Sequence, residues 1–279
     1  MPRSETLQFD EIGYWSEVKR QIIKEYASAY SKILSAQRDP ALHHVYIDAF
    51  AGPGVAISRA TKEFVPGSPL NALLVEPPFR EYHLIDLNPS KAQNLRDLLG
   101  EREDVSIYEG DCNDLLLSDV FPRVRYEDYR RGLCLLDPYG LHLNWNVMRT
   151  AGEMRSIDIF LNFPVADINR KVLWREPERV DPADIQRMNA WWGDESWREA
   201  AYTTERDLFH LEEKKDNESV AEAFRIRLKK VAKFQHVPKP IAMRNSKGAV
   251  VYYLFFASQK PVAKHIVGHI FKKYRHRGA

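Results

Sequence analysis

The sequence predicts an α/β protein with a mostly parallel sheet, a C-terminal antiparallel hairpin and a helical insertion. Apolar runs with strand character alternate with helix-like patterns from His44 to Phe163, and such alternation is typical of parallel βα units. Two further strand-like runs, 241–244 and 249–257, flank Asn245-Ser246-Lys247-Gly248, which predicts a hairpin. The alternation stops between Ala166 and Asn217. The composition, 44% hydrophobic and 29% charged in 279 residues, excludes disordered and fibrous classes.

Each element of this fold has a local pattern behind it. A first long helix, from about Trp15 to Ala36, is predicted because apolar residues recur there at spacings of three and four. The expected strands of the parallel part are 44–50, 82–86, 105–109, 133–137 and 157–163. The expected helices between them are 68–76, 89–99, 113–120 and 145–152. Ser68-Pro69 and Asn88-Pro89 each offer a side-chain N-cap followed by proline at N1, which indicates where two of these helices begin.

The segment 166–217 is rich in tryptophan and acidic residues, and we interpret it as a mostly helical insertion. The predicted organisation is an N-terminal helical element (1–40), an α/β domain (41–165 and 218–279) and this insertion (166–217). A helix at 219–234 and a basic helix at 261–274 complete the α/β domain. The tryptophans of the insertion either pack in a core or stack on exposed bases, and their helical spacing favours the core. They are Trp174, Trp191, Trp192 and Trp197.

Glycines and carboxylates follow the predicted strands where an open α/β sheet binds its ligand, beyond the carboxyl ends of the strands. Gly52 and Gly54 follow the first strand and let the backbone approach a ligand closely, although a tight turn would also use them. Asp86 ends the second strand, where a carboxylate accepts hydrogen bonds from ribose hydroxyls. Asp111 follows the third strand and is placed to accept from an adenine amino group. Both aspartates also suit helix N-caps.

Two departures from the dinucleotide motif count against NAD. The turn lacks the third glycine that dinucleotide-binding folds use, and Asp86 lies 32 positions after Gly54 rather than ~20. A nucleoside cofactor of another kind is therefore expected.

The fourth predicted strand ends in Leu136-Asp137-Pro138-Tyr139-Gly140. This motif is similar to the [D/N]-P-P-[Y/F] motif of methyltransferases that modify exocyclic amino groups of bases, and it more closely resembles the Asp-Pro-Phe-Gly of tRNA guanine-N2 dimethyltransferases. With the late hairpin, residues 44–163 and 241–258 resemble class I S-adenosylmethionine-dependent methyltransferases. The resemblance implies that Asp137, next to Pro138, grips the amino group and that Tyr139 stacks on the base. A proline-glycine turn with a packed tyrosine is the alternative.

The same resemblance implies S-adenosylmethionine as the cofactor. The cofactor-binding residues that we expect are Asp48, Phe50, Gly52, Gly54, Asp86, Asp111 and Cys112. Asn162, at the end of the fifth strand, either lines the same cleft and binds substrate or serves as a turn residue before Phe163-Pro164. No cysteine follows Pro138, which disfavours the covalent route of cytosine-C5 enzymes.

Most of the first 170 residues also resemble a bacterial family, the three-Cys-motif partner proteins, named for a neighbouring radical-SAM-like protein with three cysteines. The resemblance rests on the helix 15–30 and on the motifs at 46–54, 67–69, 110–113, 136–140 and 162–164. It implies a methyltransferase-like fold and a functional protein partner of this radical-SAM-like kind.

Charge is distributed unevenly along the chain. Residues 223–279 hold 14 of the 41 basic residues and no acidic residue, so residues 1–222 hold the other 27 basic and all 39 acidic ones. A basic face for the phosphates of RNA or DNA is one explanation. Its predicted substrate-binding residues are Lys260, Lys264, Lys272, Lys273, Arg275 and Arg277. Neutralisation of the acidic insertion within the molecule is the other explanation.

The sequence therefore favours a methyltransferase acting on an exocyclic amino group of a nucleic-acid base. A catalytically silent partner subunit, or a methyltransferase for small molecules or proteins, are the alternatives. Cys112 and Cys134 form no CxxC pattern and are expected to be small buried side chains, and no metal site is predicted. We expect no membrane span and no signal peptide, and hence a cytoplasmic protein.

Overall fold

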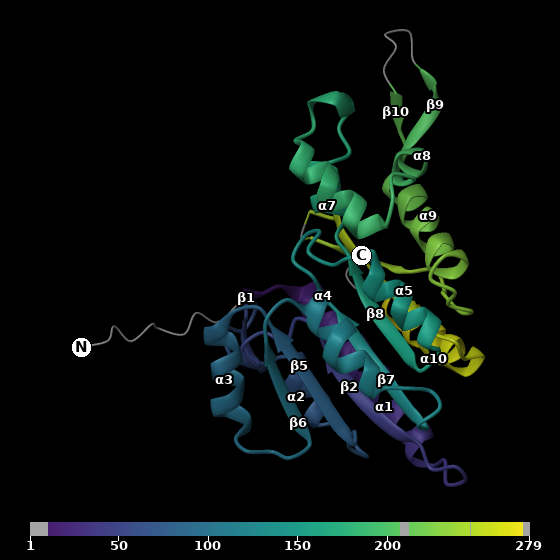
Figure 1. Cartoon of the computed structure of the whole chain (residues 1–279). Helices are drawn as coiled ribbons and strands as arrows, with labels where there is room; N and C mark the ends of the chain where they lie inside the picture. The colour runs from purple at the N-terminus through teal and green to yellow at the C-terminus, as the bar shows by residue number, and fades with distance from the viewer. Residues whose placement is uncertain (1–10, 207–211, 246, 276–279) are drawn as a thin grey trace.

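The computed structural model describes residues 11–206, 212–245 and 247–275, and a seven-stranded sheet lies at its centre (Figure 1). The strand order is β11-β12-β8-β7-β2-β5-β6. The strands are β2 (His43–Asp48), β5 (Glu81–Asp86), β6 (Val105–Glu109), β7 (Arg130–Leu136), β8 (Ile157–Phe163), β11 (Ile241–Arg244) and β12 (Val250–Ala257). The five strands from β6 to β8 pair in parallel, and β12 is antiparallel to both β8 and β11. The predicted parallel sheet with a C-terminal antiparallel hairpin is confirmed.

Helices cover both faces of this sheet because its inner strands are apolar on both sides. One face packs against α1 (Tyr14–Ser35), α2 (Ser68–Leu73), α3 (Pro89–Leu99) and α10 (Pro261–Tyr274). The other face packs against α4 (Cys112–Leu115), a π-helical turn (Leu116–Val120), a 3-10 turn (Phe121–Arg123), α5 (Trp145–Met154), α6 (Val165–Lys171) and α9 (Asn217–Lys230). In the described ranges, no helix is long and apolar enough to cross a membrane.

The two proline-containing helix starts differ from each other. Asn88 caps α3 as predicted, because its side chain accepts from the N–H groups of Ser90 and Lys91 at 2.9 and 3.3 Å. The predicted Ser68 cap is wrong. Gly67 occupies the N-cap of α2 without a side chain to offer, and the Ser68 hydroxyl is hydrogen-bonded to Asp48 instead. A tertiary partner thus outcompetes the local cap.

The insertion contains more strand than predicted. Helices α7 (Pro182–Trp192) and α8 (Trp197–Ala201) and a 3-10 turn (Pro177–Arg179) are followed by an antiparallel hairpin of β9 (Tyr202–Arg206) and β10 (Glu212–Lys214), which the sequence did not indicate. Trp191, Trp192 and Trp197 are fully buried and belong to the core of the α5 and α9 face, as their helical spacing favoured. Trp174 is 41% exposed.

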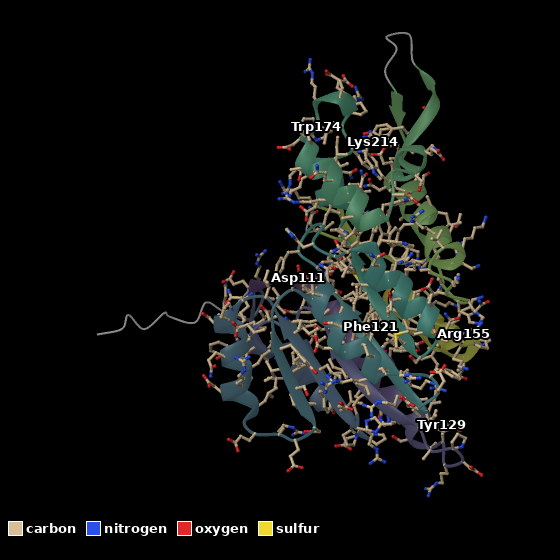
Figure 2. All side chains as sticks on the ribbon, in the orientation of Figure 1. Asp111, Phe121, Tyr129, Arg155, Trp174 and Lys214 are labelled. Atoms are coloured by element: carbon tan, nitrogen blue, oxygen red, sulfur yellow. The ribbon has the colours of Figure 1, made fainter. Side chains whose placement is uncertain are left out.

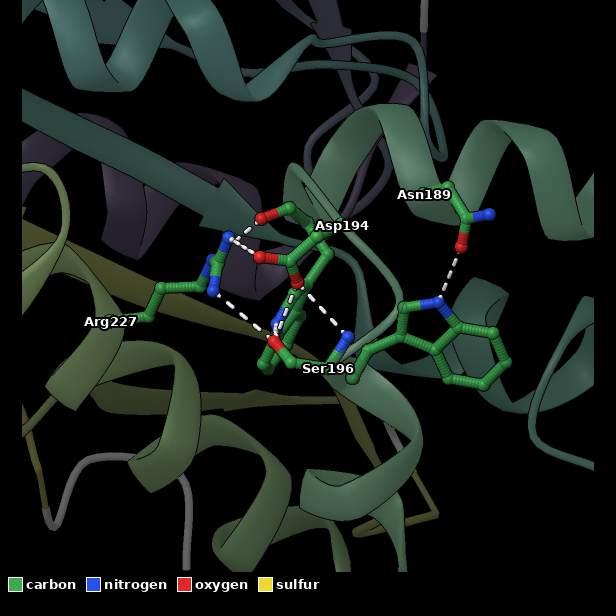
Figure 3. Close-up of polar contacts among 6 residues, drawn as sticks. Asn189, Asp194, Ser196 and Arg227 are labelled. Atoms are coloured by element: carbon green, nitrogen blue, oxygen red, sulfur yellow. Dashed lines mark hydrogen bonds and ion pairs between the residues drawn. The ribbon is translucent and has the colours of Figure 1, made fainter.

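Arg227 of α9 holds the insertion against the α/β core (Figure 3). Its guanidinium donates to the Trp192 carbonyl at 2.6 Å and to Asp194 at 2.7 Å, and it lies 4.6 Å from the centre of the Trp145 ring. A second ion pair, Lys239 to Glu218 at 2.5 Å, lies within the segment 218–279 and does not involve the insertion. Part of the C-terminal positive charge, that of Arg227, therefore neutralises the acidic insertion within the molecule.

A second, small sheet covers the carboxyl end of β2. It consists of β1 (Glu11–Ile12), β3 (Val55–Ser58) and β4 (Phe64–Pro66), with β3 parallel to β1 and antiparallel to β4. Its strands have two to four residues, too short for a periodic pattern, and the sequence analysis missed them. This sheet positions the wall of the cavity described next.

Candidate active site

The carboxyl ends of five parallel strands bring the predicted polar residues to one edge of the sheet. Asp48 ends β2, Asp86 ends β5, and Asp111 caps α4 just after β6. Asp137 and Asn162 mark the ends of β7 and β8. Since parallel strands share their direction, these side chains approach one another although the chain separates them by up to 114 residues.

A cavity of about 520 Å³ lies at this edge, between α1, the small sheet, α2 and the ends of β7 and β8. Seven of the predicted site residues line it. They are Phe50, Gly52, Gly54, Asp137, Pro138, Tyr139 and Asn162. The predicted catalytic motif and the glycine loop therefore share one cavity. Asp48, Asp86, Asp111 and Cys112 are not among the lining residues in the described part of the chain.

Asp137 is held from two sides. Lys19 Nζ of α1 lies 2.5 Å from Oδ2, and the Asn162 amide donates to Oδ1 at 2.9 Å. Side-chain exposure is 10% for Lys19 and 29% for Asp137, so the ion pair is largely shielded from water. Burial alone would lower the pKa of Lys19, but the attraction of Asp137 outweighs it and the pKa of Lys19 is raised above its usual 10.5. Lys19 therefore keeps its positive charge at neutral pH beside the Asp137 carboxylate.

Lys19 is a site residue that the sequence analysis missed. It lies on the buried face of α1, four residues after Trp15 and three before Ile22, where the helical period calls for an apolar side chain. A lysine inside an apolar helical stripe is rare unless it has a partner. A lysine within the apolar pattern of this helix is the sequence feature from which Lys19 could have been identified as a site residue.

Asn162 presents an acceptor that has no partner. Its Nδ2 donates to Asp137, and its Oδ1 is buried without a hydrogen bond from any described residue. The orientation of the amide follows from chemistry, because a carboxylate that is paired with a lysine accepts hydrogen bonds and does not donate them. A buried carbonyl oxygen without a donor costs about 1–3 kcal/mol, which a bound N–H group could offset.

Asp48 lies behind the glycine loop, away from the cavity surface. It is fully buried and accepts from the Phe50 N–H and the Tyr46 hydroxyl, both at 3.3 Å, and from Ser68. Burial raises the pKa of Asp48 from 3.8 to about 6. Its direct contacts fix the turn that carries Gly52 and Gly54.

Asp86 joins the end of β5 to the glycine loop. Its Oδ2 accepts from the Gly52 N–H at 2.8 Å and its Oδ1 from the Asn88 N–H at 2.8 Å. Each carboxylate oxygen can accept a second hydrogen bond, so Asp86 can hold the loop and still accept from a pair of vicinal hydroxyls. This geometry fits the ribose role that the sequence predicts for Asp86.

The two glycines of the loop differ in what they permit. Gly54, with φ +83°, packs so tightly that a Cβ would lie 2.9 Å from Leu98 and 3.0 Å from Leu95. Gly52, with φ +66°, faces open space, since no atom lies within 4 Å of where its Cβ would be. Gly52 is thus the glycine that leaves room for a ligand, and Gly54 is required for packing against α3.

Asp111 and Cys112 lie at the start of α4. One oxygen of Asp111 accepts from both the backbone and side-chain N–H groups of Asn113, each at 2.8 Å, which is the N-cap role considered above. Cys112 is buried, and burial followed by the nearby Asp111 charge raises the pKa of its thiol to about 12. Cys134 is buried too. Among the described residues, no group of three His, Cys, Asp or Glu side chains could hold a metal ion.

Of the six substrate-binding residues predicted in the basic C-terminal region, the five that the structure describes do not converge on the cavity. Lys260 lies 5.5 Å from the Tyr126 ring, near Tyr129, which Figure 2 shows at the end of the sheet opposite Asp111. Lys273 pairs with Glu25 of α1 at 2.6 Å. Lys272 is exposed on α10, Lys264 lines a groove beside α9, and Arg275 lines another beside β11. Arg277 lies outside the described residues.

The sheet order, the hairpin and the strand-end site define a class I methyltransferase-like α/β protein. No protein-family model matches the sequence, and no curated protein matches it. Among solved structures, the chain is similar to a Legionella pneumophila protein of the family DUF519, with 11% identity, a TM-score of 0.48, and 93% of this chain and 94% of that chain covered.

Two further solved structures are similar. A candidate methyltransferase of Thermobifida fusca has 15% identity and a TM-score of 0.44, with 88% of this chain and 82% of that chain covered. A chain in the complex of the Haloferax volcanii Trm112 methyltransferase activator with a candidate methyltransferase has 13% identity and a TM-score of 0.36, with 88% and 94% covered. At such identities and scores, the fold assignment rests on the strand order of this chain itself.

Proposed function

We propose that this protein is an S-adenosylmethionine-dependent methyltransferase that acts on an exocyclic amino group of a nucleic-acid base. The observation that carries the proposal is the shared cavity, which Asp137, Pro138 and Tyr139 line together with Gly52. A methyl donor at the loop and an amino nitrogen at Asp137 would then lie within one enclosed space, as in-line transfer requires.

The residues present fit the cofactor. Gly52 leaves open space at the loop, and Asp86 has acceptor capacity left for two ribose hydroxyls. S-adenosylmethionine, when bound, supplies an electrophilic methyl group on a sulfonium. Gly52 and Asp86 would hold it, and the walls of α1 and the small sheet would keep bulk water from the reacting nitrogen.

Asp137 and Asn162 would orient the acceptor nitrogen. Lys19 holds the Asp137 carboxylate in place, so that it can accept an N–H of the amino group, while Asn162 Oδ1 lacks a donor among the described residues. Tyr139 lines the cavity with 69% of its surface exposed, and Lys91 Nζ lies 5.8 Å from the centre of its ring. In this proposal the Tyr139 ring stacks on the base. Stacking of this kind contributes about 1–3 kcal/mol per base, comparable with the cost of extruding the base.

A catalytically silent partner subunit is the second candidate. Lys19 already occupies one oxygen of Asp137, and a pair so shielded also suits a purely structural role. The partner would be a radical-SAM-like three-Cys-motif protein, as the sequence resemblance implies. Co-purification with such a protein, together with no methyl transfer to RNA or DNA, would support this candidate.

Calorimetry with S-adenosylhomocysteine tests the proposal first. We expect S-adenosylhomocysteine to bind the wild type with micromolar affinity, and we expect no binding of NAD. The Asp86→Asn variant keeps the shape of the side chain but loses its charge, so it should bind S-adenosylhomocysteine at least about tenfold more weakly. Asp97→Asn, on the exposed side of α3, is the matched control.

The second experiment measures transfer of labelled methyl groups to RNA and DNA. We expect Asp137→Ala to lose this transfer and to keep S-adenosylhomocysteine binding. Absence of S-adenosylhomocysteine binding in folded protein would refute the proposal.

A further inference from the structure

An exposed tyrosine with two cations beside it lies at the end of the sheet opposite the cavity. Tyr126 belongs to the loop that precedes β7, and 38% of its surface is exposed. The guanidinium carbon of Arg131 lies 3.7 Å from the centre of the Tyr126 ring, and Lys260 Nζ lies 5.5 Å from it. Figure 2 shows the neighbouring Tyr129 at this end of the sheet. We call Tyr126, Arg131 and Lys260 the Tyr126 cluster, and none of the three lines the cavity of the candidate active site.

Both cations act on the hydroxyl group of Tyr126 as well as on its ring. Lys260 and Arg131 each form a side-chain hydrogen bond with this hydroxyl. Their charges hold the pKa of Tyr126 below its usual 10.0, with the charge of Lys260 as the largest cause. A lowered pKa of a phenol means that its surroundings favour negative charge at the position of its oxygen. The two positive charges therefore converge on one point of the surface.

Backbone groups hold the cluster in place. Arg131 Nη1 donates to the Tyr126 carbonyl oxygen at 3.1 Å, and the same oxygen accepts from the Tyr129 N–H at 3.1 Å. The Lys260 N–H donates to the Ser258 hydroxyl at 3.0 Å, directly before α10 begins. The loop and the start of α10 are thus fixed before a ligand binds, which reduces the entropy cost of binding.

Nearby carboxylates compensate the two cations only in part. In the ranges that the structure describes, no carboxylate lies within ion-pair distance of Lys260 or Arg131. Buried Asp158 attracts Lys260 from further away, and this attraction affects the pKa of Asp158 less than its two hydrogen bonds do. Asp128 faces Arg125 at 3.9 Å. Positive charge therefore remains at the Tyr126 hydroxyl, where an anion would be stabilised.

We infer that Tyr126, Arg131 and Lys260 form a binding site for a phosphate group, separate from the cavity of the candidate active site. An ammonium group has three N–H donors and a guanidinium group has five, so donors remain after the contacts within the cluster. The oxygens of a phosphate point in different directions and suit donors from three side chains, whereas the two oxygens of a carboxylate lie in one plane. This inference goes beyond the proposed function and does not depend on methyl transfer.

NMR spectroscopy with isotopically labelled tyrosine rings tests the inference at the site itself. The spectrum of Tyr126→Phe identifies the Tyr126 resonance among the 13 tyrosines. Inorganic phosphate is titrated at constant ionic strength, and acetate is the comparison anion. We expect the Tyr126 resonance to shift and saturate with a Kd of about 0.1–10 mM, as an exposed charged site allows, and acetate to bind at least about fivefold more weakly.

Two single variants show whether position or total charge governs binding. Lys260→Gln removes a charged donor from the cluster and should weaken phosphate binding at least about fivefold. Lys272→Gln removes an equally exposed charge near the other end of α10, and salt screening should keep its effect below about twofold. The resonances of the other tyrosines show that each variant is folded.

A single-stranded RNA oligonucleotide identifies the source of the phosphate group. RNA that binds more tightly than inorganic phosphate, and more weakly to Lys260→Gln, would assign the site to a nucleic-acid backbone. RNA binding that Lys260→Gln leaves unchanged, with phosphate binding weakened, would assign it to small phosphorylated molecules. Both results support a phosphate site.

Four results would overturn the inference. They are an unshifted Tyr126 resonance in phosphate, equal binding of phosphate and acetate, equal affinity of Lys260→Gln and wild type, and a shift shared by most tyrosines. The last of these would show a general effect of ions on the protein and no binding at the Tyr126 cluster.

Discussion

Lys19 and Asp137 form a shielded ion pair, 2.5 Å from Nζ to Oδ2, across 118 positions of sequence. It ties the N-terminal helix α1 to the end of β7, and so to the residue that we place beside the acceptor nitrogen. The pair therefore connects α1, which forms one wall of the cavity, with Asp137 at the end of β7. The same contact also fixes α1 against the central sheet, on which its buried residues pack.

Removing one partner of this pair should destabilise the protein. We expect Lys19→Met to lower the free energy of unfolding by about 1–3 kcal/mol, less than the 3–5 kcal/mol typical of a fully buried pair because Asp137 is partly exposed. The pKa of Lys19 is raised, so the stabilisation is present at pH 7 and is lost only as pH rises above 10.5 through the folded-state value. Urea unfolding at pH 7 measures it.

A double-mutant cycle isolates the pair. Lys19→Met combined with Asp137→Asn should cost at least about 1 kcal/mol less than the two single changes together. The exposed pair of Arg102 and Asp104 provides the matched cycle, where coupling should stay below about 0.5 kcal/mol. Strict additivity at Lys19 and Asp137 would contradict the interpretation.

The buried carboxyl of Asp48 should make the protein less stable as pH rises, whereas an acid in a salt bridge makes a protein more stable as pH rises. Its pKa is raised by burial from 3.8 to about 6, so between these values the folded state holds a proton that the unfolded state releases. Stability therefore falls as pH rises through this window, by up to about 3 kcal/mol from this group. Other groups oppose it, Glu81 above all, whose pKa is lowered to about 2.

The contributions of those other groups cancel when the free energy of unfolding of the wild type is compared with that of Asp48→Asn at the same pH. We expect the variant to gain up to about 3 kcal/mol relative to the wild type between pH 4 and pH 7, as seen in urea unfolding at each pH. Asp97→Asn, at an exposed position of α3, should show no such gain. A flat difference between Asp48→Asn and wild type would mean that Asp48 is charged throughout the range.

Local sequence patterns predicted the large elements because those elements are long and periodic. The strands of the parallel sheet, the helix α1 and the hairpin of β11 and β12 all lie within a few residues of the expected ranges. The Asn88 cap was also predicted, since its partners are two and three residues away. Local information is sufficient where the stabilising contact is itself local.

Contacts between distant segments account for what was missed. In the small sheet, β1 pairs with β3 across 46 residues of sequence. The Ser68 hydroxyl is hydrogen-bonded to Asp48, 20 residues away, and does not cap α2. Asp48 looked like a ligand residue from its place at a strand end, but it lies behind the loop. The excess of basic residues in 223–279 likewise does not indicate which cations border the cavity, because folding places these basic residues on several different surfaces.

The two loop glycines should give separable effects. Gly52→Ala places a Cβ in the open space of the cavity, so it should weaken S-adenosylhomocysteine binding by at least about tenfold while costing about 1–2 kcal/mol of stability from its left-handed backbone. Gly54→Ala meets Leu95 and Leu98 and should cost more stability. Calorimetry and urea unfolding measure the two effects.

Gly248 supplies the control for backbone strain alone. It has φ +80° with open space around its Cβ position, and it lies in the turn between β11 and β12, away from the cavity. Gly248→Ala should lose as much stability as Gly52→Ala and bind S-adenosylhomocysteine normally. Equal binding by the Gly52 and Gly248 variants would show that the open space at Gly52 is not used by the donor.

Tyr139 should matter for the substrate and not for the fold. Its ring is 69% exposed, so Tyr139→Ala should change the free energy of unfolding by less than about 0.5 kcal/mol. If the ring stacks on a base, the same change should lower kcat/KM for methyl transfer by about 5- to 150-fold, whereas Tyr139→Phe should keep most of it, because stacking uses the ring and not the hydroxyl. Tyr129→Ala removes a similarly exposed ring at the opposite end of the sheet and should leave kcat/KM unchanged. Equal activity of Tyr139→Ala and wild type on a nucleic-acid substrate would exclude stacking and move substrate recognition to other residues of the cavity.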